Sequence, residues 1–208
     1  MLPEHRALMM RANRLLGAAL VDHNLVKLEE LEKANERLLE VIASGQPRQS
    51  TVLGLLAYEM KVVREDDILQ HVVETEGVGL IDLRNYDTSD EIRKNLDLGA
   101  CWATWSVPFD REEDFHFIAT AYYLSPAVRA YWEKQFGTQL VWYGTTLDVI
   151  ADYLEKAVAE QGSPAAGQNT RSPFAVAAGT KSPVGTAAAK AAGSKPPLPR
   201  ASGTTAPV

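Results

Sequence analysis

The chain has 208 residues, of which 46% are hydrophobic and 23% charged, and it contains one cysteine. A single cysteine excludes a disulfide framework or a cysteine-built zinc site, and no apolar run reaches the roughly 18 to 20 residues that span a bilayer. Residues 1–160 carry 27 acidic against 16 basic residues, a net charge of −11, whereas phosphate contacts need a basic face. The amino terminus mixes charged and apolar residues and lacks the pattern of a signal peptide. We predict a cytoplasmic protein with no direct membrane insertion and no nucleic-acid partner.

A helical unit occurs twice in the first part of the chain. The stretch RLLGAALVDHNLVKLEEL (14–31) is followed 37 positions later by TVLGLLAYEMKVVREDDI (51–68), and both contain a Leu-Gly pair, an apolar pair and a closing aliphatic residue. Apolar residues recur at helical spacing before and after Asn24, and asparagine tolerates the left-handed backbone that often ends a helix. Lys61 takes the corresponding place in the second copy. We therefore predict a helix, a tight turn, an apolar anchor and a second helix, used twice.

Strands and helices alternate in the following residues. Segments rich in β-branched and aromatic residues predict strands at 79–83, 101–109, 115–123 and 138–143. Helices are predicted at 88–96, 125–137 and 145–160, where Thr88 and Thr145 begin capping boxes and Ser125 precedes a proline at the first helical position. This order predicts a small sheet with helices packed on it.

Residues 161–208 differ from the rest in composition. They are rich in Ala, Pro, Ser, Gly and Thr, contain no acidic residue and carry five basic ones. Such a segment buries too little apolar surface to offset the entropy of ordering it, so we predict a disordered tail, whose KPPLPR sequence at 195–200 favours a polyproline conformation and is a candidate docking peptide. The predicted fold class is α+β: an amino-terminal helical bundle of two repeated helix-turn-helix units, then a small α/β sandwich, then the tail. The corresponding domains are a helical subdomain at 1–78, with repeats at 14–43 and 51–76, a small α/β subdomain at 79–160, and the tail at 161–208.

The doubled unit, the following GVGLIDL and the later SVPFDREEDFHFIATAYYLSP and FGTQLVWYGTTLDVIADYLEKAV together resemble the amino-terminal domain of type II secretion and type IV pilus assembly ATPases. The resemblance covers roughly residues 12–160. It implies a free-standing copy of that domain without the ATPase domain. The GTKS sequence at 179–182 is no phosphate-binding loop, because that loop needs glycine directly before its lysine and Thr180 stands there.

One branch of this family binds cyclic di-GMP through the doubled motif, and the resemblance implies a ligand-binding role for the positions that match. These are Leu16, Gly17, Leu20, Val21, Leu25, Val26 and Leu31 in the first copy, and Leu53, Gly54, Val62, Val63 and Ile68 in the second. The motif's polar positions do not match: its arginines are replaced by Leu15 and Val52, its turn glycines by Asn24 and Lys61, and its terminal glutamines by Leu38 and Thr75. A guanidinium that stacks on guanine and pairs with phosphate contributes about 1 to 3 kcal/mol, so its loss from both copies weakens any nucleotide binding.

No catalytic or metal site is predicted. The four histidines show no metal-ligand spacing, and the sequence identifies no base for Cys101. Trp102 and Trp105, three apart in the predicted strand 101–109, fall on opposite faces, so we expect one of them to be an exposed interface anchor.

The sequence therefore predicts a non-catalytic protein-interaction or regulatory module without a cofactor. The resemblance favours an adaptor in a secretion, pilus, motility or polarity system, with a protein partner. The alternative is a receptor for cyclic di-GMP, a second-messenger nucleotide.

Overall fold

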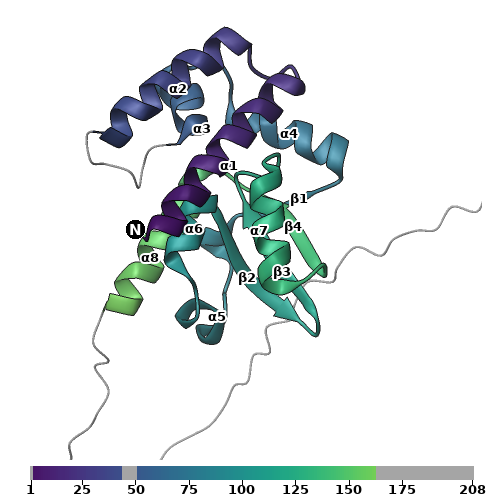
Figure 1. The fold of residues 1–208 in the computed structure, drawn as a ribbon. Coiled ribbons are helices and arrows are strands. Elements are labelled where there is room, and N and C mark those ends of the chain that lie inside the picture. Colours follow the sequence, from purple (N-terminus) through teal and green to yellow (C-terminus); the bar gives the residue numbers. More distant parts are fainter. Residues whose placement is uncertain (1, 44–50, 163–208) are drawn as a thin grey trace, which may run out of the picture. The chain divides into compact units, whose positions relative to one another are not determined.

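The computed structural model describes residues 2–43 and 51–162, which lie within one compact unit, Met1–Ala166. The prediction of a disordered tail therefore falls almost wholly on residues outside the described part of the chain. The α+β fold class is confirmed (Figure 1). None of the described helices combines the length and the hydropathy needed to cross a lipid bilayer.

The first part of the chain is helical. Its elements are α1 (Pro3–Asp22), α2 (Leu28–Ala43), α3 (Val52–Gly54), a π-helical turn η1 (Leu55–Glu59) and α4 (Glu65–Glu76). Helix α1 begins well before the predicted first repeat (14–43), because Pro3 suits the first turn of a helix, where no backbone N–H is needed. Asn24 (φ 56°) and Lys61 (φ 55°) both adopt the left-handed backbone, so the predicted tight turn is present in both copies.

The second part contains a four-stranded sheet. The elements in chain order are β1 (Gly79–Leu80), the 3-10 turn η2 (Leu83–Asn85), α5 (Asp90–Lys94), α6 (Leu98–Thr104), β2 (Ser106–Glu112), β3 (Phe115–Thr120), α7 (Pro126–Phe136), β4 (Leu140–Gly144) and α8 (Leu147–Gly162). The strand order is β1-β4-β3-β2; β2 is antiparallel to β3, while β3–β4 and β1–β4 are parallel. Strand β2 is thus an edge of the sheet.

The predicted strand at 101–109 is wrong over its first half. Residues 98–104 form helix α6, which begins where Asp97 Oδ1 accepts a hydrogen bond from the Ala100 amide (3.0 Å). The helix ends at Trp105, whose φ of 47° is left-handed, and β2 begins at the next residue. Trp102 and Trp105 are 9% and 5% exposed and pack edge to face, with ring centroids 5.3 Å apart. The expectation that one of them is an exposed interface anchor is therefore wrong, because both rings lie in the core.

Two predicted helix caps are displaced by one residue. Ser89 rather than Thr88 caps α5, its hydroxyl accepting from the Ile92 amide (3.4 Å). At α8, Thr146 rather than Thr145 accepts from an amide of the first turn, that of Val149 (3.4 Å). Where two adjacent residues both carry a hydroxyl, the backbone geometry determines which of them accepts the hydrogen bond from the first turn of the helix.

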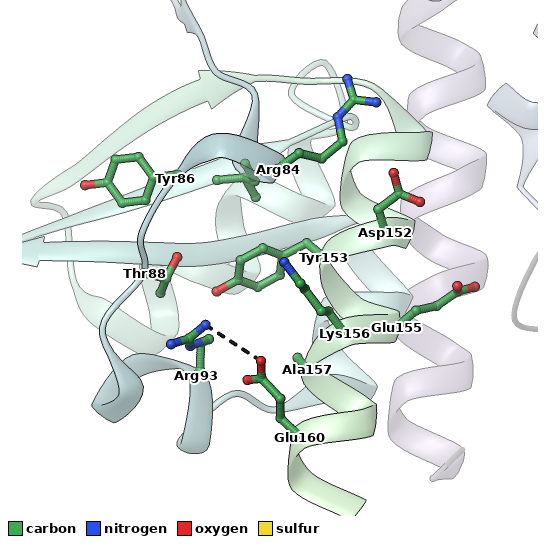
Figure 2. Close-up of a pocket in the computed structure, with 11 residues that line it drawn as sticks. Arg84, Tyr86, Thr88, Arg93, Asp152, Tyr153, Glu155, Lys156, Ala157 and Glu160 are labelled. Carbon is green, nitrogen blue, oxygen red and sulfur yellow. Dashed lines mark ion pairs between the residues drawn. The ribbon is translucent and has the colours of Figure 1, made fainter.

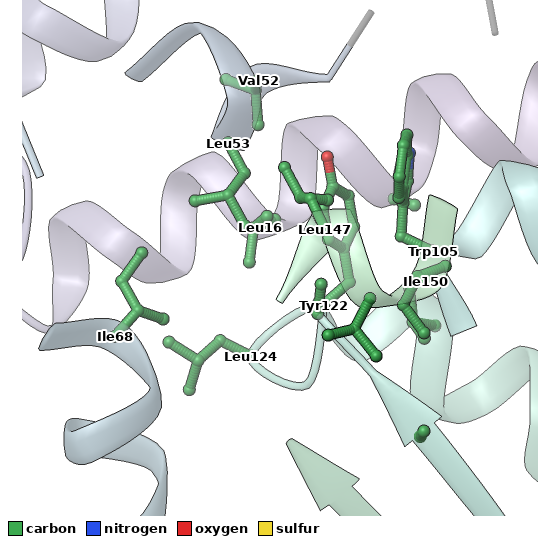
Figure 3. Packing of buried hydrophobic residues seen from close by; sticks show 14 of the residues in the cluster. Leu16, Val52, Leu53, Ile68, Trp105, Tyr122, Leu124, Leu147 and Ile150 are labelled. Atoms are coloured by element: carbon green, nitrogen blue, oxygen red, sulfur yellow. The ribbon is translucent and has the colours of Figure 1, made fainter. Parts of the chain in front are cut away.

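One hydrophobic cluster connects the helical part with the sheet. Figure 3 shows Leu16 of α1 and Leu53 of α3 near Tyr122, Leu124 and Leu147, which follow β3 and begin α8. Helix α1 also contacts α6 and α7. The division into subdomains at residue 78 stays a prediction.

A buried asparagine fixes the centre of this cluster. Asn13 is 2% exposed, and its side-chain amide donates to the Met9 carbonyl (2.9 Å). Its Oδ1 accepts from the Val52 amide (2.7 Å) and from the Tyr122 hydroxyl (2.8 Å). One side chain therefore joins α1, the start of α3 and the segment after β3.

Candidate functional site

The positions that match the family motif pack into the core or against it. Leu16, Leu20, Val26, Leu31, Leu53, Val63 and Ile68 are buried, Val21, Leu25 and Val62 are half-buried beside them, and Gly17 and Gly54 lie in helices. Glycine is favoured at position 17 for a steric reason, because a Cβ atom there would stand 2.5 Å from Leu31 Cδ1. Ligand binding by these residues stays a prediction. Their burial explains the residue types at these positions by packing alone.

The positions that carry polar groups in the family motif offer little to a nucleotide here. Val52 and Leu38 are buried, and Leu15 is half-buried. Asn24, Lys61 and Thr75 are exposed, but the first two serve the left-handed turns and Thr75 donates its hydroxyl to the His71 carbonyl (2.7 Å).

A different part of the molecule forms a groove lined by aromatic side chains. It has a volume of about 580 Å³, and its lining residues come from α5, the segment that follows it, strands β2 and β3, and α7. Figure 1 shows where these elements lie. We call it the aromatic groove, and its lining is Ser89, Glu91, Ile92, Asn95, Leu96, Asp97, Pro108, Asp110, Arg111, His116, Tyr131, Trp132, Gln135 and Phe136. This volume falls within the range that is typical of ligand pockets.

The aromatic rings of the groove are stacked. Phe136 stacks on His116 (ring centroids 4.3 Å apart, planes 13° apart) and on Trp132 (5.6 Å, 11°). Tyr131 packs edge to face on Trp132 at 5.2 Å. Trp132 is 3% exposed and its indole N–H donates to the Thr104 hydroxyl (3.2 Å), so the tryptophan anchors the stack, while the other three rings are half-buried. The groove thus offers rigid aromatic surface whose geometry is set before anything binds.

Acidic groups predominate around these rings. Glu91, Asp97 and Asp110 line the groove, and Arg111 is its only arginine or lysine among the described residues. Burial lowers the pKa of His116 and the Arg111 guanidinium lowers it further, with Asp114 opposing, so this imidazole is neutral at pH 7. The groove therefore has a net negative charge.

A smaller hollow adjoins the groove at its α7 side. It shares Asp97, Tyr131 and Gln135 with the groove and is completed by Glu4, His5 and Leu8 of α1. His5 Nε2 lies 3.3 Å from Asp97 Oδ2. Tyr131 stands in the lining of both hollows, so an extended ligand can contact both.

A cavity of about 270 Å³ lies against α8 (Figure 2). The hydroxyls of Thr88 and Tyr153 line it, and neither has a hydrogen-bond partner of standard geometry among the described residues. Arg93, also in the lining, pairs with Asp90 (2.7 Å) and Glu160 (3.7 Å). The lining matches three basic residues with three acidic ones: Arg84, Arg93 and Lys156 with Asp152, Glu155 and Glu160. This balance gives the cavity no charge with which to select a charged ligand.

The described residues contain neither an activated cysteine nor a cluster of side chains placed to bind a metal ion. Cys101 is fully buried, and burial, with a smaller contribution from Asp97, raises the pKa of its thiol, which opposes formation of the reactive thiolate. Within residues 2–43 and 51–162, no group of three or more His, Cys, Asp or Glu side chains is placed to hold a metal ion.

Comparison with known proteins shows no family for this chain. No known protein family and no curated protein matches it. It is similar to a solved structure of MshE with cdg. The TM-score is 0.43 at 14% sequence identity, and the match covers 68% of this chain and 97% of that chain. A likeness of this size establishes neither a shared family nor a shared function.

Sequence reasoning missed the aromatic groove. One available signal was on α7, where Tyr131 with Gln135 and Trp132 with Phe136 stand four residues apart and so share neighbouring helix faces. His116, the ring that stacks on Phe136, comes from β3, and the acidic residues come from α5 and later segments. No local sequence pattern connects these residues to α7.

Proposed function

We propose that this protein is a non-catalytic protein-interaction module that binds an extended segment of a protein partner in the aromatic groove. The observation that carries the proposal is the stack of His116, Phe136 and Trp132 in an open groove with Tyr131 beside it. Aromatic side chains contribute much of the binding energy at protein interfaces, because they bury large areas at small entropic cost.

The chemistry around the groove supports a protein partner over a nucleic acid. Three carboxylates line it against one arginine, and residues 1–160 carry a net charge of −11, so a phosphate backbone would be repelled. We further propose that the protein is a cytoplasmic adaptor, without a cofactor or metal, in a secretion, pilus, motility or polarity system.

Photo-crosslinking in the native cells tests the proposal. A benzoylphenylalanine residue placed at Gln135, which is exposed and lines the groove, is expected to form a covalent adduct with a protein that mass spectrometry identifies. The matched control is the same residue at Glu133, which is exposed on α7 outside the groove lining and is expected to give little or no adduct.

The adduct's identity and position decide the outcome. Equal adducts at both positions, or none at Gln135, would contradict binding in the groove. An adduct at Gln135 alone with a protein unrelated to secretion, pili, motility or polarity would keep the interaction module and overturn the adaptor assignment.

A calorimetric titration addresses the alternative of a cyclic di-GMP receptor. We expect no binding heat with cyclic di-GMP at high micromolar concentration, because Leu15 and Val52 replace the arginines that would stack on guanine and pair with phosphate. Saturable heat from the unaltered chain would contradict this prediction and favour the receptor.

A further inference from the structure

The aromatic groove combines two features that select different parts of a peptide. Its half-buried rings offer flat apolar faces, and its acidic residues offer charge. We infer that the segment bound there is a basic, proline-rich stretch of the partner in an extended polyproline conformation. This inference rests on the proposed function.

Stacked rings favour proline. A polyproline helix is already extended in the free peptide, so it loses little entropy on binding, and its pyrrolidine rings pack against aromatic faces. Tyr131 and His116 supply such surface from two elements, α7 and β3, while Phe136, stacked on both His116 and buried Trp132, holds the His116 ring in place. Since Tyr131 also lines the adjoining hollow, successive turns of an extended peptide can pack on either side of it.

The acidic residues favour lysine or arginine in the same peptide. Glu91 is exposed on α5, and Asp97 lies where the groove meets the adjoining hollow, to which Glu4 also contributes. Asp110 accepts hydrogen bonds from the Tyr86 hydroxyl and the Arg111 amide, which hold its carboxylate in place. Because His116 is neutral, it does not offset this charge. An acidic peptide would meet repulsion along the same path.

Strand β2 disfavours β-strand addition, the other common way in which proteins bind an extended peptide. Strand β2 is an edge strand, and a peptide added to it as a further strand would need its backbone N–H groups. Pro108, in the groove lining, has none, and the register with β3 shifts between Pro108 and Asp110. Recognition by side chains therefore fits this edge better than strand addition.

A three-peptide titration tests the inference. The probes are the synthetic peptides KPPLPR, EPPLPE and KAALAR, which separate the effect of charge from that of proline. They are added to the ¹⁵N-labelled full-length chain, and amide and indole shifts are followed by NMR. The chain carries Pro196→Ala, Pro197→Ala and Pro199→Ala, so that its own KPPLPR sequence does not compete. We expect KPPLPR to shift the Trp132 indole and α7 amides, and the other two peptides to bind about tenfold more weakly.

Two pairs of matched variants locate the binding. Phe136→Leu keeps an apolar side chain but removes the ring and is expected to weaken KPPLPR binding about five- to tenfold. Phe115→Leu, on the 47% exposed ring of β3 outside the groove lining, is expected to leave binding unchanged. Glu91→Gln is expected to weaken binding about two- to threefold at low salt and less at high salt, and Glu133→Gln is the exposed control.

The possible outcomes separate this inference from the proposed function. Equal binding of all three peptides, no binding of KPPLPR, or shifts away from α7 would overturn the inference. If the Gln135 crosslink to a protein still forms, the groove binds a segment of other chemistry and the proposed function stands. If the crosslink fails as well, both are wrong.

Discussion

Replacing Asn13 with alanine is expected to lower the free energy of unfolding by about 3 to 5 kcal/mol, because two buried donors lose their acceptor. The Val52 amide and the Tyr122 hydroxyl both donate to Asn13 Oδ1 in a site that is 2% exposed, and alanine supplies no acceptor in its place. Each such buried, unsatisfied group costs about 1 to 3 kcal/mol, and the loss also removes the tie between α1, α3 and the segment after β3.

Urea unfolding followed by circular dichroism measures this effect. The control is Asn85→Ala, an exposed asparagine of η2, which is expected to change stability by less than about 0.5 kcal/mol. Tyr122→Phe removes one donor and leaves the Val52 bond intact, so it is expected to cost about 1 to 2 kcal/mol and remains measurable if Asn13→Ala does not fold. An Asn13→Ala chain within about 1 kcal/mol of the unaltered one would contradict the role of this network.

Features set by local sequence were predictable. The left-handed turns at Asn24 and Lys61 follow from where the helical periodicity breaks, and the helices on either side of them follow from apolar spacing. The sequence places Ser125 directly before a helix, and it does stand at the N-cap of α7, but its hydroxyl donates to the Ala12 carbonyl (3.0 Å) instead of accepting from the first turn of the helix. The local sequence predicts where Ser125 stands, but not its hydrogen-bond partner, because Ala12 is 113 residues away in the chain.

Features set by tertiary contacts were not predictable. The aromatic content of residues 101–109 favours a strand, yet the Asp97 cap and burial of Trp102 and Trp105 produce a helix and a left-handed stop before β2. The aromatic groove depends on α7 lying beside β3 and the segment after α5, a topology that no short pattern encodes. The sequence alone therefore does not predict the groove, because no local pattern shows that its lining residues come together.

Glu65 is the second residue for which a large effect is expected, since it connects the second helical unit with α8. Its carboxylate accepts hydrogen bonds from the Leu147 amide (2.9 Å), at the start of α8, and from the Tyr58 hydroxyl. Glu65→Ala leaves both donors without this acceptor and is expected to destabilise the chain by about 2 to 4 kcal/mol at pH 7. Glu155→Ala, at an exposed position of α8, is the control and is expected to change stability by less than about 0.5 kcal/mol.

Glu65→Gln removes the charge and keeps one acceptor oxygen. The Leu147 amide and the Tyr58 hydroxyl bond to different oxygens of the carboxylate, so the glutamine oxygen can accept from the Leu147 amide while its NH₂ group faces the Tyr58 hydroxyl. Burial raises the pKa of Glu65 above its ordinary 4.5, against the opposing effect of the Tyr58 and Leu147 hydrogen bonds. The folded state therefore binds this proton more tightly than the unfolded state, and the stability that protonation contributes is present below pH 4.5 and lost as pH rises through the folded-state pKa. Glutamine does not titrate. We therefore expect Glu65→Gln to be less destabilising, relative to the unaltered chain, at pH 7 than at pH 4, as measured by urea unfolding at both values. A variant that becomes more destabilising as pH rises would show that the ionised carboxylate is favoured by the fold and that its hydrogen bonds outweigh its burial.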